Sequence, residues 1–164
     1  MKRVEANDPN LIYELANHHH TKGLRCSQED REKAKELWTQ AARLGSSQAH
    51  YTLGNDYYEV GDLKKARFHL GAAAMAGHET ARDDLGYIEI KSNKKELAVR
   101  HWMIAASAGS YNAMHNLLLA FEDGVVSREL IDSMLTAYNN SCAEVRSNAR
   151  DAYIKMCIDL IGEK

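Results

Sequence analysis

The chain of 164 residues is 45% hydrophobic and 27% charged, which is typical of one globular domain with a core of useful size. Its net charge of −2, without clusters of lysine and arginine, argues against nonspecific binding to nucleic acid and against docking on an anionic membrane. No apolar run is long enough for a signal peptide or a membrane span, so we expect a cytoplasmic protein. Cys26, Cys142 and Cys157 form no Cys-x-x-Cys pair and indicate free thiols.

The first predicted helix hairpin covers residues 8–45. Asp8 and Pro9 have the pattern of an N-cap followed by the first helical residue, and this helix should end near residue 21. Ser27 predicts the start of a second helix, and Gly45 lies where a left-handed residue would end it. Apolar residues recur at helical spacing in both helices: Leu11, Ile12, Leu15 and Ala16 in the first, and Ala34, Leu37, Trp38, Ala41 and Ala42 in the second.

A five-residue segment that ends in glycine recurs along the chain. It stands at Ala41–Gly45, Ala73–Gly77 and Ala105–Gly109. The spacing is 32 residues each time. A fixed period in the range of about 20 to 50 residues predicts a solenoid of structural repeats. This period places the second and third hairpins at residues 46–77 and 78–109.

These two hairpins carry their own turn and packing signals. Gly61 and Asp62 predict a turn followed by a helix cap, and Asn93 with Glu96 has the pattern of a capping box. Small residues stand where the two helices of a hairpin must approach closely. They are Gly54, Gly86, Ala66 and Ala98.

The fourth repeat, residues 110–141, has Ser141 where the others have their closing glycine. Ser127 predicts the N-cap of its second helix, and Ser141 with Glu144 suggests one more capping box. A last helix in residues 142–161 would cover the apolar face at the end of the solenoid. Its apolar face should consist of Val145, Ala149, Ala152, Met156 and Leu160. The sequence thus predicts a single all-α domain over residues 8–164, an α-solenoid of about four antiparallel helix hairpins in a right-handed superhelix with a C-terminal capping helix.

The second repeat has the most specific pattern. It reads Ala-x3-Leu-Gly-x2-Tyr over residues 49–57, then a glycine turn, Lys65-Ala66, and Ala-Ala-Met-Ala-Gly over residues 73–77. This pattern resembles the Sel-like (Sel-one-type) repeat of the tetratricopeptide-like superfamily, and the resemblance spans residues 8–140. The stretch 121–151 is also similar to the tail of algal multi-repeat members. The resemblance implies a non-catalytic adaptor or scaffold for protein complexes, without a cofactor.

In tetratricopeptide-like stacks the first helix of each hairpin lines a concave groove, so the resemblance implies which residues face a partner. Offsets from Leu53 and Gly54 give the equivalent positions in every repeat. The candidate partner-binding residues are Asn17, Tyr51, Asn55, Tyr58, Asp83, Tyr87 and His115. The same offsets also give Asn10, Tyr13, His20, Thr21, Gln48, Glu59, Thr80, Ile90, Lys91, Asn112, Leu119, Glu122 and Asp123. Tyrosine, asparagine and histidine combine contact area with hydrogen bonding at modest entropic cost.

A neutral or basic extended segment of a partner protein is the expected ligand. Chaperone-binding relatives hold an acidic C-terminal tail with lysine and arginine, whereas the matching positions here are Tyr13, Asp83 and Tyr87. Two alternatives remain open: the tyrosines pack between helices and the groove is only solvated, or the chain is a structural subunit held in a larger assembly through its convex face or ends. We expect a monomer or a weak homodimer.

No catalytic or metal-binding motif accompanies the repeats. His18, His19 and His20 are consecutive, so on a helix they point about 100° apart and do not converge on one ion. The sequence has no Gly-x-Ser-x-Gly elbow, no phosphate-binding loop and no His-Glu-x-x-His motif. It therefore predicts neither an enzyme nor a metalloprotein.

Overall fold

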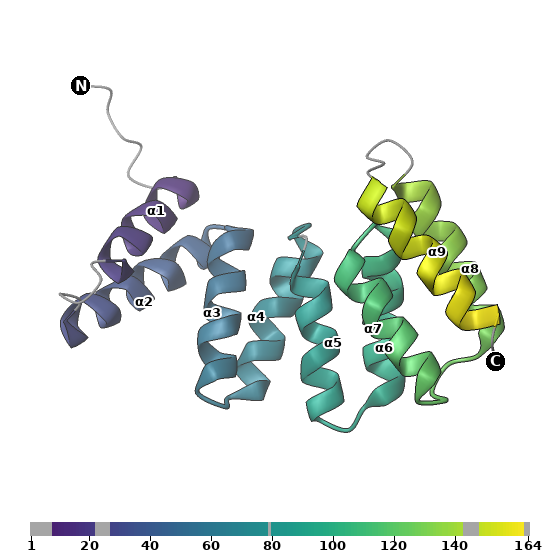
Figure 1. Cartoon of the computed structure of the whole chain (residues 1–164). Coiled ribbons are helices and arrows are strands. Elements are labelled where there is room, and N and C mark those ends of the chain that lie inside the picture. Colours follow the sequence, from purple (N-terminus) through teal and green to yellow (C-terminus); the bar gives the residue numbers. More distant parts are fainter. Residues whose placement is uncertain (1–7, 22–26, 79, 143–147, 163–164) are drawn as a thin grey trace. The chain divides into compact units, whose positions relative to one another are not determined.

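The computed structural model describes residues 8–21, 27–78, 80–142 and 148–162. These residues form α-helices joined by short turns, and no strand occurs among them, which confirms the predicted all-α fold of helix hairpins (Figure 1). The helices are α1 (Pro9–His20), α2 (Gln28–Arg43), α3 (Ser47–Glu59), α4 (Leu63–Met75), α5 (Ala81–Lys91), α6 (Lys95–Ser107), α7 (Tyr111–Glu122), α8 (Arg128–Ser141) and α9 (Asn148–Gly162). The chain divides into two compact units, Met1–Ala81 and Arg82–Lys164, each of which is described by itself.

The first unit contains two hairpins, α1–α2 and α3–α4, and α2 packs on α3. Side-chain hydrogen bonds cap the N-termini of α1 and α2 at the predicted residues. The Asp8 side chain accepts from the backbone N–H of Asn10, and Ser27 and Asp30 form a reciprocal capping box. The buried residues of this core are Ile12, Ala16, Ala34, Trp38, Ala41, Ala42, Ala49 and Leu53.

Helix α1 buries only part of its apolar set. Ile12 and Ala16 belong to the buried cluster, whereas Leu11 and Leu15 are nearly half exposed. Each leucine precedes a buried residue by one position and therefore lies about 100° around the helix from it. Only Ile12 and Ala16 of this apolar set therefore pack into the core.

Left-handed glycines follow the second helices of the hairpins, as predicted. Gly45, Gly77 and Gly109 have φ angles of 93°, 83° and 93°, a conformation that residues with a Cβ rarely adopt. The preceding helices end within two residues of each glycine. The 32-residue period of the sequence therefore marks where the second helix of each of these hairpins ends.

Asn93 forms a turn rather than a helix cap. Its φ angle is 57°, and the N-cap of α6 is Lys94, whose side chain makes no capping hydrogen bond. The capping box predicted for Asn93 and Glu96 is therefore wrong. Asn93 lies 32 residues after Gly61, and asparagine tolerates the left-handed conformation that this turn position requires.

Small residues bring the helices of a hairpin together at the predicted positions. A Cβ atom on Gly54 would lie 2.6 Å from Cγ of Leu70. A Cβ atom on Gly86 would overlap the indole ring of Trp102. A larger residue at either glycine would therefore push two helices apart.

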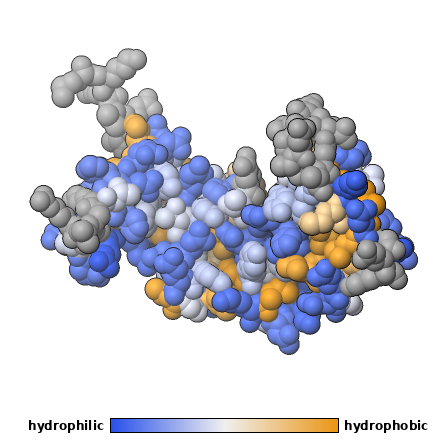
Figure 2. Space-filling model, in the orientation of Figure 1, coloured by the Kyte–Doolittle hydropathy of each residue, from blue (hydrophilic) through white to orange (hydrophobic). Residues whose placement is uncertain are grey.

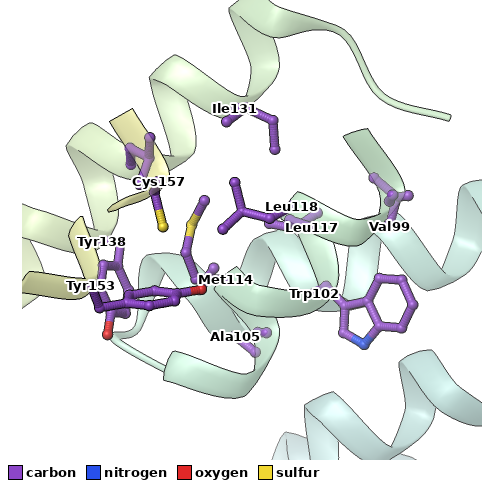
Figure 3. Close-up of a cluster of buried hydrophobic side chains, with 14 of the residues drawn as sticks. Val99, Trp102, Ala105, Met114, Leu117, Leu118, Ile131, Tyr138, Tyr153 and Cys157 are labelled. Atoms are coloured by element: carbon purple, nitrogen blue, oxygen red, sulfur yellow. The ribbon is translucent and has the colours of Figure 1, made fainter. Parts of the chain in front are cut away.

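The second unit has its core among α6, α7, α8 and α9 (Figure 3). Tyr138 of α8 and Tyr153 of α9 lie beside each other, and the Cys157 sulfur points toward Met114. Helix α5 joins this unit through Trp102, whose Nε1–H donates to the backbone carbonyl of Asp83 at 3.4 Å. Cys142 and Cys157 are free and buried, while Cys26 lies outside the described residues.

Helix α9 covers the core with a different face from the predicted one. Tyr153 and Cys157 are buried, whereas Met156 is 58% exposed and Leu160 is partly buried. The buried face is thus displaced by one residue, or about 100°, from the prediction. The remaining predicted positions, Val145 and the side chains of Ala149 and Ala152, lie outside the described part of the chain.

Ser141 ends a helix instead of beginning one. It is the last residue of α8, and its hydroxyl donates to the Tyr138 carbonyl at 2.9 Å. The next described helix begins only at Asn148. The capping box predicted for Ser141 is therefore wrong, and its expected partner Glu144 lies outside the described residues.

A histidine pair links the two helices of the second hairpin. The Nδ1 atoms of His50 on α3 and His69 on α4 are 3.1 Å apart, so that one ring donates to the other. Tyr57 stacks on His69 with ring centroids 5.5 Å apart. Burial lowers the pKa of His50, against a smaller opposing effect of its hydrogen bond with the Ala42 backbone. Burial, and then the nearby His50, lower the pKa of His69.

Acidification should therefore destabilise the α3–α4 hairpin. Both histidines favour the neutral form when folded, so below their ordinary pKa of 6.5 the unfolded chain binds more protons than the folded chain. The stabilisation is present above pH 6.5 and is lost as the pH falls through the lower pKa values of the folded state. We expect a lower Tm at about pH 5.5 than at about pH 7.5. The fall should be smaller in His69→Gln but unchanged in His18→Gln, whose side chain is exposed; an unchanged fall in His69→Gln would contradict the prediction.

Candidate partner-binding surface

The first helices of the first unit carry four of the predicted partner-binding residues in half-buried positions: Asn17, Tyr51, Asn55 and Tyr58. Asn17 is tied to its own hairpin, because its Oδ1 accepts a hydrogen bond from Trp38 Nε1–H at 3.0 Å. One side-chain acceptor of Asn17 is thus already used inside the hairpin. A partner would meet only the partly exposed edges of these residues.

Tyr51 and Asp83 contact the residue at the start of the following repeat. Tyr51 stacks on His78 with ring centroids 3.9 Å apart. Asp83 and Ser110 lie 32 residues further along, and the Ser110 hydroxyl donates to Asp83 Oδ2 at 2.5 Å. Asp83 is 4% exposed, and this burial raises the pKa of its carboxyl while the bond from Ser110 opposes the rise. Asp83 is therefore a packing residue in the structure, not an accessible one.

A cleft of about 260 Å³ opens in the second unit among α5, α6 and α7. Tyr87, Ile90 and Leu119 line it and are each between 41% and 47% exposed. All three stand at first-helix positions that the repeat offsets assign to the groove. The full lining is Tyr87, Ile90, Lys95, Val99, Trp102, Asn116, Leu119, Ala120, Asp123 and Val125.

Asn116 is a buried polar residue in this cleft that the sequence analysis missed. Its side chain is 6% exposed, and its Oδ1 accepts from the Tyr87 hydroxyl at 3.2 Å. Its Nδ2 is buried and has no hydrogen-bond partner among the described residues. An unpaired buried donor costs about 1–3 kcal/mol. The sequence did hold a signal, because Asn116 shares the buried helical stripe of Ala113, Leu117 and Ala120.

The other polar residues of this region are exposed. Lys95 and Asp123 bring one positive and one negative charge to the lining of the cleft. His115 is exposed on α7, where its ring is parallel to that of Tyr111 with centroids 6.4 Å apart. His115 is not among the lining residues, so the predicted partner-binding residues do not all meet at one place.

A solved structure has the same helical architecture. With a TM-score of 0.65 and 20% sequence identity, the chain matches a protective antigen present in uropathogenic Escherichia coli strains, whose structure displays an SLR (Sel-like repeat) fold. The chain has the Sel-like repeat fold. The match covers 96% of this chain but only 38% of the antigen chain. No family model matches the sequence, and no curated protein matches it.

The second helices of the hairpins also expose large apolar side chains. Phe68 and Met75 lie on α4, and Leu97 and Ile104 lie on α6. On the face shown in Figure 2, hydrophobic surface gathers over the second unit, whereas the surface over α2 and α3 is mainly hydrophilic. A contact through the second helices is therefore a physical alternative to binding in the cleft.

The consecutive histidines of α1 take part in packing. His20 lies against Trp38 with ring centroids 5.1 Å apart, and Nδ1 of His19 is 3.4 Å from an Asp30 carboxylate oxygen. In the described part of the chain, no three histidine, cysteine, aspartate or glutamate side chains are grouped as a metal site requires. None of the helices described there combines the length and hydrophobicity needed to cross a membrane.

Proposed function

We propose that this chain is a non-catalytic interaction module that binds a partner protein through the first-helix face of its second unit. The cleft among α5, α6 and α7 is the observation that carries the proposal. It combines half-exposed apolar side chains with a buried amide donor that lacks a partner among the residues that the structure describes. Apolar concave surfaces with a few convergent polar groups are typical of binding sites. The Sel-like repeat fold supports a role in protein complexes, because its stacked hairpins present an extended surface.

A second candidate function is that of a subunit held in a larger assembly through its second helices. Phe68 on α4 and Ile104 on α6 favour it, because large apolar side chains exposed on a helix can be covered by a partner. In that case the cleft would be incidental to binding. The two functions differ in which side of the hairpin touches the partner.

Site-specific photo-cross-linking in native lysate separates the two candidates. A benzophenone side chain is placed at Leu119, in the cleft, or at Ile104, which is exposed on α6 outside it. A cross-linked protein that appears only with the Leu119 probe is the expected result. A product only with the Ile104 probe would replace cleft binding with the assembly function, and no product with either probe would contradict both.

A further inference from the structure

We propose that the cleft of the second unit captures an extended polypeptide segment by one apolar side chain, with the neighbouring backbone carbonyl accepting a hydrogen bond from Asn116 Nδ2. The inference rests on the proposed function, since it names the part of the partner that the cleft holds. Three features of the cleft lead to this ligand: the unpaired amide, the apolar walls and the balance of charge.

The unpaired amide requires an acceptor. Tyr87 donates to Asn116 Oδ1, so this bond fixes which end of the amide is occupied and leaves the two N–H groups of Nδ2 unused. A ligand carbonyl would satisfy that donor and would remove the cost of leaving it buried and unpaired. Extended backbone offers such a carbonyl at every residue.

A small outward shift of the half-exposed Tyr87 ring, with its hydroxyl still bonded to Asn116 Oδ1, should uncover Nδ2 when the segment enters. Nδ2 is shielded from solvent in the structure, while the ring bonded to the other end of the amide is 47% exposed. Exposed side chains move within picoseconds to nanoseconds, so this shift would not slow binding.

The walls and the size of the cleft fit a single apolar side chain. Val99, Leu119 and Val125 are apolar, and Trp102 contributes an aromatic surface. The volume of about 260 Å³ lies below the range of about 300–1,000 Å³ that is usual for small-molecule sites. A leucine, methionine or phenylalanine carried on a peptide would fill such a space without needing a larger cavity.

The charges of the cleft favour a segment without net charge at this point. Lys95 and Asp123 both belong to the lining, so neither sign dominates. A like charge brought next to either residue would be disfavoured, and no cluster of one sign is present to attract a charged tail. An apolar anchor in a neutral stretch satisfies both conditions.

A displayed library of random twelve-residue peptides, selected on the intact chain, tests this inference. The selected peptides are synthesised, and their Kd is measured by fluorescence anisotropy against the wild type and three variants. Asn116→Asp keeps the acceptor for Tyr87 but removes the amide donor, and binding is measured at about pH 8, above the ordinary pKa of an aspartate carboxyl, to favour its ionised form. Leu119→Ala shortens an apolar wall, and Ile104→Ala makes a similar truncation on an exposed residue outside the cleft. A melting curve of each variant establishes that it is folded.

Selected peptides should share one apolar residue, and Asn116→Asp should weaken their binding at least about tenfold. Leu119→Ala should weaken it about fivefold, and Ile104→Ala by less than about twofold. If Asn116→Asp does not fold, the contrast between Leu119→Ala and Ile104→Ala decides the result. Peptides that bind all variants equally would overturn the inference.

The cross-linking experiment distinguishes failure of this inference from failure of the proposed function. A partner cross-linked at Leu119, together with a library that yields no binder, would overturn capture of an extended segment while leaving protein binding in place. No cross-link at Leu119 and no selected peptide would overturn both.

Discussion

Gly86→Ala should lower the free energy of unfolding by about 1–3 kcal/mol through overpacking. The new methyl group would overlap the indole of Trp102, a rigid ring that is 5% exposed and bonded through Nε1–H to the Asp83 carbonyl. The ring cannot yield without moving α6 or breaking that hydrogen bond. Alanine is the better helix former by about 1 kcal/mol, so destabilisation would mean that the overlap outweighs helix propensity. Urea denaturation followed by circular dichroism measures the change.

Gly71→Ala provides the matched control. Gly71 lies within α4, and a Cβ atom there would meet no atom within 4 Å. This substitution should raise the free energy of unfolding by about 0.5–1 kcal/mol, because only the propensity and chain-entropy effects remain. The two glycine substitutions should therefore have opposite signs. Stabilisation by both would show that α5 and α6 do not approach closely at Gly86.

A double-mutant cycle assigns the effect of Gly86 to its neighbour. Trp102→Ala alone should cost about 3–5 kcal/mol, because it empties a buried aromatic site. In that background, Gly86→Ala should no longer destabilise the protein, since the overlapping ring is gone. The coupling between the two positions is the measured quantity. If the free-energy changes of the two substitutions simply add, the destabilisation by Gly86→Ala does not come from overlap with Trp102.

Deletion of residues 143–164 should produce a protein that aggregates or no longer unfolds cooperatively. The deletion removes α9, which contributes the buried Tyr153 and Cys157 to the core of the second unit. The loss of a buried aromatic side chain alone costs about 3–5 kcal/mol, a large part of the stability of a small domain. The Tyr138 surface that α9 helps to bury would also become exposed. Size-exclusion chromatography with light scattering and a thermal melt measure both outcomes.

Two point variants of α9 make the test quantitative. Tyr153→Ala should reproduce much of the instability, whereas Met156→Ala should change the free energy of unfolding by less than about 0.5 kcal/mol, because Met156 is 58% exposed. A monomeric and cooperatively folded deletion variant would show that α9 is not a cap. Equal effects of the two point variants would show that its buried face is not the one described.

Features that depend on residues close in sequence were predictable from the sequence. Asp8, Ser27 and Asp62 cap helices through hydrogen bonds to residues two or three positions away. The left-handed glycines follow from steric limits on a single residue. Asn93 departs from its predicted role because the same residue type serves as a cap or as a left-handed turn, and the repeat position decides between them.

Only the tertiary structure decided which first-helix residues are accessible. The repeat offsets treated Asp83 and Tyr87 alike, yet Asp83 is buried against Ser110 while Tyr87 is half exposed in the cleft. Asn116 became a candidate only when its unpaired amide was located beneath the surface. Helix periodicity depends on residues within one turn of each other, so it can be recognised from the sequence alone. Burial of a side chain depends on atoms of another repeat, about 30 residues away in the sequence. The size and polarity of those distant atoms cannot be inferred from the residues next to the side chain.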